Sequence, residues 1–110
     1  MSDRELSTEA REFDLTSETA PLQRVRAIVS GKVQGVGYRF HTQQMARSLD
    51  VAGWVRNLPD GRVEAVFEAS AVLVERAVQW CHHGSPAARV RAVEVVSEPP
   101  EGLQGFEICY

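Results

Sequence analysis

The sequence is short of cysteines and of long apolar runs, and both shortages narrow the class of protein. Its 110 residues include only two cysteines, Cys81 and Cys109, which form no CxxC pair and lack metal-ligand spacing. We expect two reduced thiols, with a disulfide as the alternative, because a domain of this size folds on its core alone. No apolar stretch approaches the roughly 20 residues that a membrane-spanning helix needs. The N-terminus also lacks the basic start and apolar centre of a secretory signal, so we expect a cytoplasmic protein without membrane contact.

Positive charge is also in short supply, and the deficit lies at one end of the chain. The net charge is −3, but residues 1–23 alone carry six acids and two arginines, which leaves the remainder at +1. Few large apolar side chains occur in this stretch, so it cannot bury enough surface to offset the entropy lost on ordering. We predict a disordered acidic tail over 1–23 and one globular domain over 24–110.

After the tail, strand-like and helix-like patterns follow one another. Val25, Ala27 and Val29 alternate with polar residues as in a half-buried strand, and Pro59-Asp60-Gly61 is typical of a hairpin turn. The expected strand, helix, hairpin, helix and two final strands cover residues 24–31, 39–50, 51–69, 71–84, 88–98 and 106–110. This order predicts an α+β ferredoxin-like split βαβ sandwich (βαββαβ), with two helices on one face of an antiparallel sheet and a short closing strand.

The stretch GKVQGVGYRF, residues 31–40, lies between the first strand and the first helix. A helix N-terminus offers free backbone N–H groups and the positive end of the helix dipole, and therefore attracts anions. Gly35 and Gly37 allow the backbone to curl so that successive N–H groups converge. Arg39 adds a planar fork of donors that suits two phosphate oxygens. The pattern predicts a cradle for a tetrahedral oxyanion, although glycines in this position also form simple turns.

Two familiar nucleotide motifs are excluded. A Walker A loop ends in Gly-Lys-Ser/Thr, whereas Gly37 is followed by Tyr38 and Arg39. The dinucleotide fingerprint GxGxxG would need a third glycine where Phe40 stands.

GKVQGVGYRF, together with GWVRNLPDGRVE at residues 53–64, resembles the acylphosphatase family. The likeness continues through GSPAARVRAVEV and GFEI and spans nearly all of residues 24–110. It implies hydrolysis of acyl phosphates to a carboxylate and inorganic phosphate, with Arg39 binding the phosphoryl group and Asn57 positioning the attacking water. Backbone N–H groups implied to surround the phosphoryl group are those of Gln34, Gly35, Val36, Gly37, Tyr38 and Arg39. The family often has Phe where Tyr38 stands.

Such a sparse site is chemically sufficient for this reaction. A carboxylate leaving group has a conjugate-acid pKa near ~4 and departs without a general acid. In a loose phosphoryl-transfer transition state the nucleophile gains little charge, so positioning and charge stabilisation suffice. No metal or cofactor is required. The expected partners are a small-molecule acyl phosphate and inorganic phosphate, the latter as product and competitive ligand, and the expected state is a monomer.

Several other polar and aromatic residues have simpler interpretations. We expect His41 to lie on the surface and to point away from Arg39. We expect His82 and His83 to interact with a helix C-terminus rather than with a metal. Lys32 either adds positive field near the cradle or is a solvated edge charge. Trp54 and Trp80 are expected to pack in the core or at its edge.

Two other function classes remain as alternatives. The split βαβ fold also serves as an RNA-binding module, but Glu64 and Glu68 stand where that module needs aromatic or basic residues. The second alternative is a non-catalytic module that senses phosphate or acyl phosphate. Pure anion binding would need Arg39 but not Asn57, which favours the enzyme.

Overall fold

The computed structural model describes residues 21–110. Residues 1–20 of the predicted acidic tail lie outside the described residues. Gln23, the last residue assigned to the tail, instead pairs with Ala69 in the sheet, so the first strand begins one residue earlier than predicted. No helix in the described part of the chain is long and apolar enough to span a membrane.

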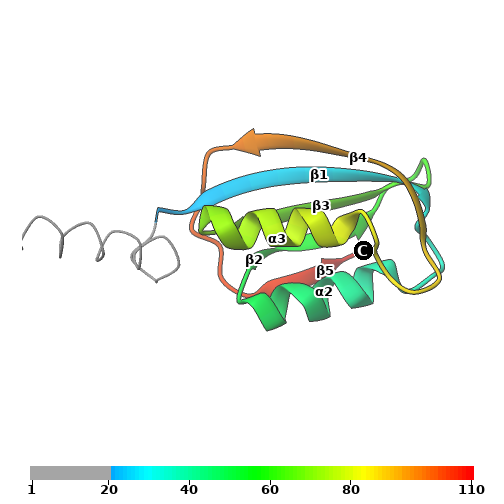
Figure 1. Ribbon diagram of the computed structural model, residues 1–110, viewed down its shortest axis with the longest axis horizontal. Coiled ribbons are helices and arrows are strands. Elements are labelled where there is room, and N and C mark those ends of the chain that lie inside the picture. The colour runs from blue at the N-terminus through cyan, green and yellow to red at the C-terminus, as the bar shows by residue number, and fades with distance from the viewer. Residues whose placement is uncertain (1–20) are drawn as a thin grey trace, which may run out of the picture.

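The described residues form two layers, a sheet and a pair of helices (Figure 1). The elements in chain order are β1 (Gln23–Lys32), α2 (Tyr38–Leu49), β2 (Ala52–Asn57), β3 (Val63–Ala69), α3 (Ala71–Cys81), β4 (Arg89–Glu98) and β5 (Phe106–Cys109). The strand order is β4-β1-β3-β2-β5, and both helices cover the same face. This architecture confirms the predicted ferredoxin-like fold class.

The closing strand makes the sheet mixed rather than wholly antiparallel. β1 pairs antiparallel with β3 and β4, and β2 pairs antiparallel with β3, whereas β5 pairs parallel with β2. β4 runs opposite to β1 and finishes at the end of the sheet where β2 begins. The short connection over residues 99–105 enters β5 from that end, so β5 must run in the same direction as β2.

The core lies between the helices and the sheet. Alternate residues of β1 and β3 face the helices, as the period-two pattern of the sequence predicted. The buried strand residues on this face include Val25, Ala27, Val29, Val63, Ala65, Phe67 and Phe106. The helices contribute Tyr38, Ala46, Val74, Ala77 and Cys81. The apolar stripes predicted for the two helices therefore do face the sheet.

The opposite face of the sheet carries a network of ion pairs. Arg24 and Arg26 on β1 both pair with Glu98 on β4, at 3.0 and 2.7 Å. Glu64 on β3 pairs with Arg56 at 2.6 Å and also with Arg26. The Trp54 ring lies against the guanidinium groups of these two arginines. Long charged side chains thus cover the face of the sheet that no helix covers.

Glu68 ties the final connection to this network. Its buried carboxylate accepts hydrogen bonds from the backbone N–H groups of Glu101, Gly102 and Leu103 at 2.8, 3.0 and 2.9 Å. Arg24 donates to the same carboxylate at 3.1 Å. A single side chain of β3 therefore fixes the connection that leads into β5.

Candidate active site

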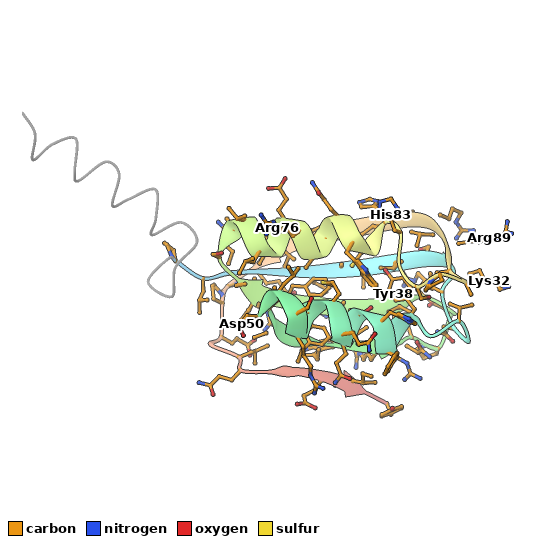
Figure 2. All side chains as sticks on the ribbon, turned by 60° about the horizontal axis from the view of Figure 1, so that its bottom comes forward. Lys32, Tyr38, Asp50, Arg76, His83 and Arg89 are labelled. Atoms are coloured by element: carbon orange, nitrogen blue, oxygen red, sulfur yellow. The ribbon has the colours of Figure 1, made fainter. Side chains whose placement is uncertain are left out.

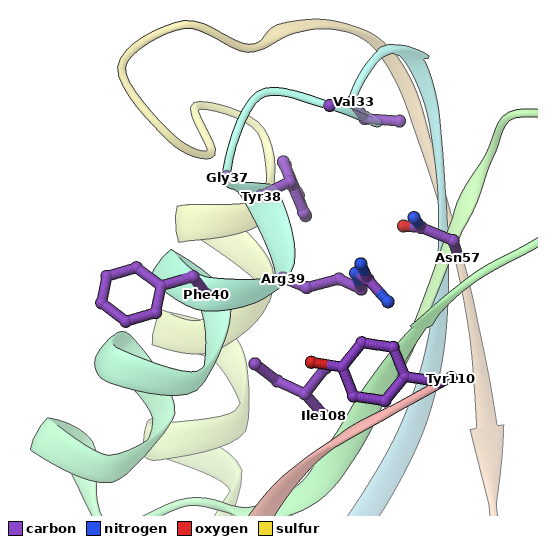
Figure 3. Close-up of a pocket in the computed structure, with 9 residues that line it drawn as sticks. Val33, Gly37, Tyr38, Arg39, Phe40, Asn57, Ile108 and Tyr110 are labelled. Atoms are coloured by element: carbon purple, nitrogen blue, oxygen red, sulfur yellow. The ribbon is translucent and has the colours of Figure 1, made fainter.

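Three separate segments meet at one end of the molecule around a cavity of about 240 Å³. They are the loop between β1 and α2, the end of β2, and the end of β5 (Figure 3). The lining residues are Val33, Gly35, Gly37, Tyr38, Arg39, Phe40, Asn57, Ile108 and Tyr110. The structure thus places the two residues predicted to be catalytic, Arg39 and Asn57, in the same cavity.

The loop before α2 has the geometry of an anion cradle. Gly35 and Gly37 have φ angles of 73° and 77°, in the left-handed region that favours glycine. Nothing lies within 4 Å of a Cβ added at Gly35, so its backbone conformation, not lack of space, requires glycine. Among residues 21–110, none of the backbone N–H groups of residues 34–39 donates to a backbone carbonyl in the turns and loops. These donors, at the positive end of the α2 dipole, are available to phosphate oxygens.

Arg39 reaches from the first turn of α2 across the cavity. Its guanidinium lies 4.8 Å from the centre of the Tyr110 ring, and its NH1 lies 3.5 Å from the carbonyl oxygen of Cys109. Figure 3 shows the guanidinium directed toward the side on which Asn57 and Tyr110 lie. The arginine is thus positioned by β5 while its remaining donors face the cavity.

Asn57 is the last residue of β2, directly before the hairpin turn. The turn is closed by the hydrogen bond from Leu58 N–H to Arg62 O, at 2.8 Å, and Asp60 accepts from the backbone N–H of Arg62. The predicted hairpin is therefore confirmed. It presents the Asn57 carboxamide, half-buried, to the cavity.

Tyr38 begins α2, but its side chain points into the core. Its hydroxyl donates to the carbonyl oxygen of Cys81 at 2.8 Å, and its ring packs against Trp80. Burial raises the pKa of Tyr38 far above its ordinary value and raises the pKa of the Cys81 thiol to about 12. Neither group ionises near neutral pH, so only the backbone of Tyr38 can serve the site. Both described cysteines are free thiols.

His41 lies at the surface and contacts the loop before α2. It is half-buried, and its Nδ1 lies 2.9 Å from the carbonyl oxygen of Gly37. Because a carbonyl only accepts, Nδ1 carries the proton in this contact. His82 and His83 are exposed beyond the end of α3, as expected. Within residues 21–110, no three His, Cys, Asp or Glu residues lie together in a way that could hold a metal ion.

Ile108 and Tyr110 line the cavity but were not among the predicted site residues. The short segment FEICY gave no local sign of function, because its residues reach the site only through the parallel pairing of β5 with β2. The strand order would have been needed to find them.

Lys32 and Arg89 lie at the cavity end of the molecule, and their Cα atoms are direct partners in the β1–β4 ladder. Figure 2 shows both at the same end as Tyr38, with Asp50 at the opposite end of α2. Both side chains are exposed, so they add positive charge to the end that holds Arg39.

Comparisons with known proteins agree with this geometry. The family model described as Acylphosphatase matches residues 25–108. An acylphosphatase from Trichormus variabilis is 59% identical over 87 residues, which cover 79% of this chain and 86% of the relative. An acylphosphatase from Rubrobacter xylanophilus is also 59% identical, over 78% of this chain and 79% of the relative.

This chain belongs to the acylphosphatase family. The crystal structure of acylphosphatase from Bacillus subtilis superposes with a TM-score of 0.78 at 38% identity, covering 82% of this chain and all of that one. The protein is therefore an acylphosphatase, an enzyme that hydrolyses acyl phosphates. The family match includes the glycine loop, Arg39 and Asn57, whereas Tyr110 lies beyond it.

Proposed function

We propose that this acylphosphatase acts by direct attack of water on a phosphoryl group held between the glycine loop and Arg39. The observation that carries the proposal is the shared cavity, which the glycine loop, the Arg39 guanidinium and the Asn57 carboxamide line together. The N–H groups of residues 34–39 bind the phosphoryl oxygens, and Arg39 binds two of them with its planar fork. Because these donors are fixed before the substrate arrives, they stabilise the transition-state charge without reorganisation.

Asn57 positions the nucleophile in this proposal. Its carboxamide oxygen accepts a hydrogen bond from a water, which leaves a lone pair of the water directed at phosphorus. The water oxygen forms the new bond to phosphorus while the bond from phosphorus to the acyl oxygen breaks. The electron pair of that bond leaves with the carboxylate, and a phosphoryl oxygen takes the proton of the water. The products are a carboxylate and inorganic phosphate.

The leaving group explains why no acid is needed at the site. A carboxylate is stable at neutral pH because its conjugate acid has a pKa near ~4. Tyr38 and Cys81, whose pKa values are raised by burial, are not needed as proton donors. The acyl group lies outside the cradle, so the site holds the phosphate end of a small-molecule substrate, and inorganic phosphate competes for the same donors.

The decisive test separates phosphate binding from attack by water. We expect Asn57→Ala to lower kcat for an aryl acyl phosphate by roughly 10- to 1,000-fold. Its inhibition constant for inorganic phosphate should stay within about threefold of that of the wild type, because the carboxamide does not bind the anion. Arg39→Ala should instead weaken phosphate inhibition and lower kcat/KM together, by about 100-fold or more.

Two outcomes would contradict the mechanism. Loss of phosphate inhibition in Asn57→Ala would assign the carboxamide to anion binding. A folded wild type that binds phosphate but does not turn over would favour the non-catalytic sensing module. Heat-denaturation curves for each variant serve as the control for folding.

A further inference from the structure

The side chain of Gln34 links the glycine loop to the hairpin turn that follows Asn57. Its Nε2 donates to two carbonyl oxygens, that of Leu58 at 2.8 Å and that of Arg62 at 2.9 Å. Both neighbours are acceptors only, so the nitrogen of the amide must face them. One side chain therefore uses both amide hydrogens to hold the two ends of the turn.

Two other side chains, those of Ser85 and His41, bind carbonyl oxygens of the glycine loop but do not contact the hairpin turn. The Ser85 hydroxyl donates to the carbonyl oxygen of Val36 at 2.9 Å, and Ser85 itself is buried. His41 binds the carbonyl oxygen of Gly37, at 2.9 Å. By holding these carbonyls, Ser85 and His41 fix the peptide planes of the loop and with them the directions of its N–H groups. Gln34 instead fixes where the loop lies relative to the end of β2.

We propose that Gln34 is a positioning residue that sets the separation between the phosphate cradle and the Asn57 carboxamide. The inference rests on the proposed function, in which the cradle holds phosphorus and Asn57 holds water. Leu58 directly follows Asn57, and its carbonyl belongs to the Leu58–Pro59 peptide, so a hydrogen bond to this carbonyl restrains the backbone one residue after Asn57. An in-line attack needs water and phosphorus within a few tenths of an ångström of the reactive distance, and a shift of about 1 Å costs ~100-fold in rate.

The hairpin turn does not depend on Gln34 for its own hydrogen bonds. The Leu58 carbonyl also accepts from Gly61 N–H at 3.2 Å, and the Arg62 carbonyl also accepts from Leu58 N–H at 2.8 Å. Loss of the Gln34 amide therefore leaves neither carbonyl unpaired, and the turn should keep its shape. We expect the distance between the turn and the loop to change instead, and the experiment must be sensitive to that distance.

The test is a comparison of kcat with phosphate inhibition in Gln34→Leu. We expect kcat to fall by about 10- to 100-fold while the inhibition constant for inorganic phosphate stays within about threefold of the wild-type value. Ser85→Ala should give the opposite split, with phosphate inhibition weakened more than kcat, because Ser85 orients the cradle itself. Gln79→Leu, at an exposed position of α3, is the matched control and should behave as wild type.

A double-mutant cycle with Asn57→Ala shows whether Gln34 acts through Asn57. If it does, adding Gln34→Leu to Asn57→Ala lowers kcat by less than about twofold more. A full additional 10- to 100-fold loss would overturn the proposal, as would a wild-type kcat for folded Gln34→Leu. Should Gln34→Leu not fold, Gln34→Asn, whose shorter side chain does not span both carbonyls, takes its place.

Failure of the proposed function would look different. In that case Asn57→Ala alone would leave kcat unchanged. Any loss of kcat in Gln34→Leu would then be independent of Asn57, because removing the Asn57 carboxamide would itself have no effect on kcat.

Discussion

At the residue scale, Arg39 depends on neighbours that come from the far end of the sequence. Its guanidinium lies over the Tyr110 ring and near the Cys109 carbonyl. The pairing of β5 with β2 places both residues, because Cys109 ends β5 and Tyr110 follows it directly. A free arginine side chain loses considerable rotamer entropy when it binds a phosphoryl group. The ring restricts the guanidinium before substrate arrives, so part of this entropy is already lost in the free enzyme.

Replacement of the aromatic ring should therefore weaken substrate binding. A cation–π contact at an exposed position contributes about 0.5–1 kcal/mol, so Tyr110→Leu should raise KM and the phosphate inhibition constant about two- to fivefold. Tyr110→Phe retains the ring face and should match the wild type. Steady-state kinetics with phosphate as inhibitor measure both constants. A lower KM in Tyr110→Leu would show that the ring instead blocks the acyl group.

The sequence allowed some site residues to be predicted and not others, for a physical reason. Gly35, Gly37 and Arg39 all lie within residues 35–39, so their common role is visible as a local pattern. Asn57 was found only through the resemblance of its motif. Tyr110 has no local pattern, because its place in the site depends on the direction and neighbour of β5.

At the element scale, β5 is held by contacts from both layers. On the helix side, Gln43 and Arg47 of α2 donate to the carbonyl oxygen of Phe106 at 3.0 and 3.3 Å. On the other side, Glu68 binds the connection that leads into the strand. β5 has only four residues, so its pairing with β2 alone would leave it weakly held.

The Glu68 carboxylate is a charged group whose removal should destabilise the fold. Burial alone would raise its pKa, but the N–H groups of Glu101, Leu103 and Gly102 and the Arg24 guanidinium outweigh burial and lower the pKa below its ordinary value. Glu68→Gln leaves Arg24 without one partner and weakens three hydrogen bonds. We expect the free energy of unfolding to fall by about 3 kcal/mol at pH 7, as measured by urea denaturation.

The pH dependence gives this prediction a second readout. A pKa lowered in the folded state stabilises the wild type fully above the ordinary value of about 4.3, and this stability is lost as the pH falls through the folded value. Glu68→Gln cannot bind that proton, so the difference between the two proteins should shrink below about pH 4. Glu75→Gln, on the exposed side of α3, is the control. A constant difference at all pH values would contradict the role of the charge.

Element positions were predictable where a period or a turn signal exists. The helices and the hairpin follow from apolar spacing and from Pro59-Asp60-Gly61, and the structure confirms both. The parallel pairing of β5 was not predictable, because the sequence shows that a strand exists but not which edge it joins. The burial of Glu68 was not predictable either, because its backbone N–H donors come from the connection over residues 99–105, which has no sequence pattern of its own.

At the scale of the whole molecule, positive charge gathers at the end that holds the active site. Lys32 and Arg89 face one another across β1 and β4, an arrangement of like charges that costs stability in a ladder. Both side chains are exposed, so solvent reduces this cost. Together with Arg39 and the α2 N-terminus we expect them to create a local positive potential that attracts an acyl phosphate, although the protein's net charge is −3.

Neutralising one of these cations should slow substrate capture in a salt-dependent way. We expect Arg89→Gln and Lys32→Gln each to lower kcat/KM roughly twofold at about 10 mM ionic strength, where the Debye length is ~30 Å. The effect should vanish near 0.5 M salt, and kcat should not change, since neither side chain lines the cavity. The matched control is Arg76→Gln, an exposed arginine of α3 that Figure 2 shows away from Lys32 and Arg89. If Arg76→Gln lowered kcat/KM equally, net charge rather than its placement would govern capture, and if the loss persisted at high salt, Lys32 and Arg89 would act by direct contact.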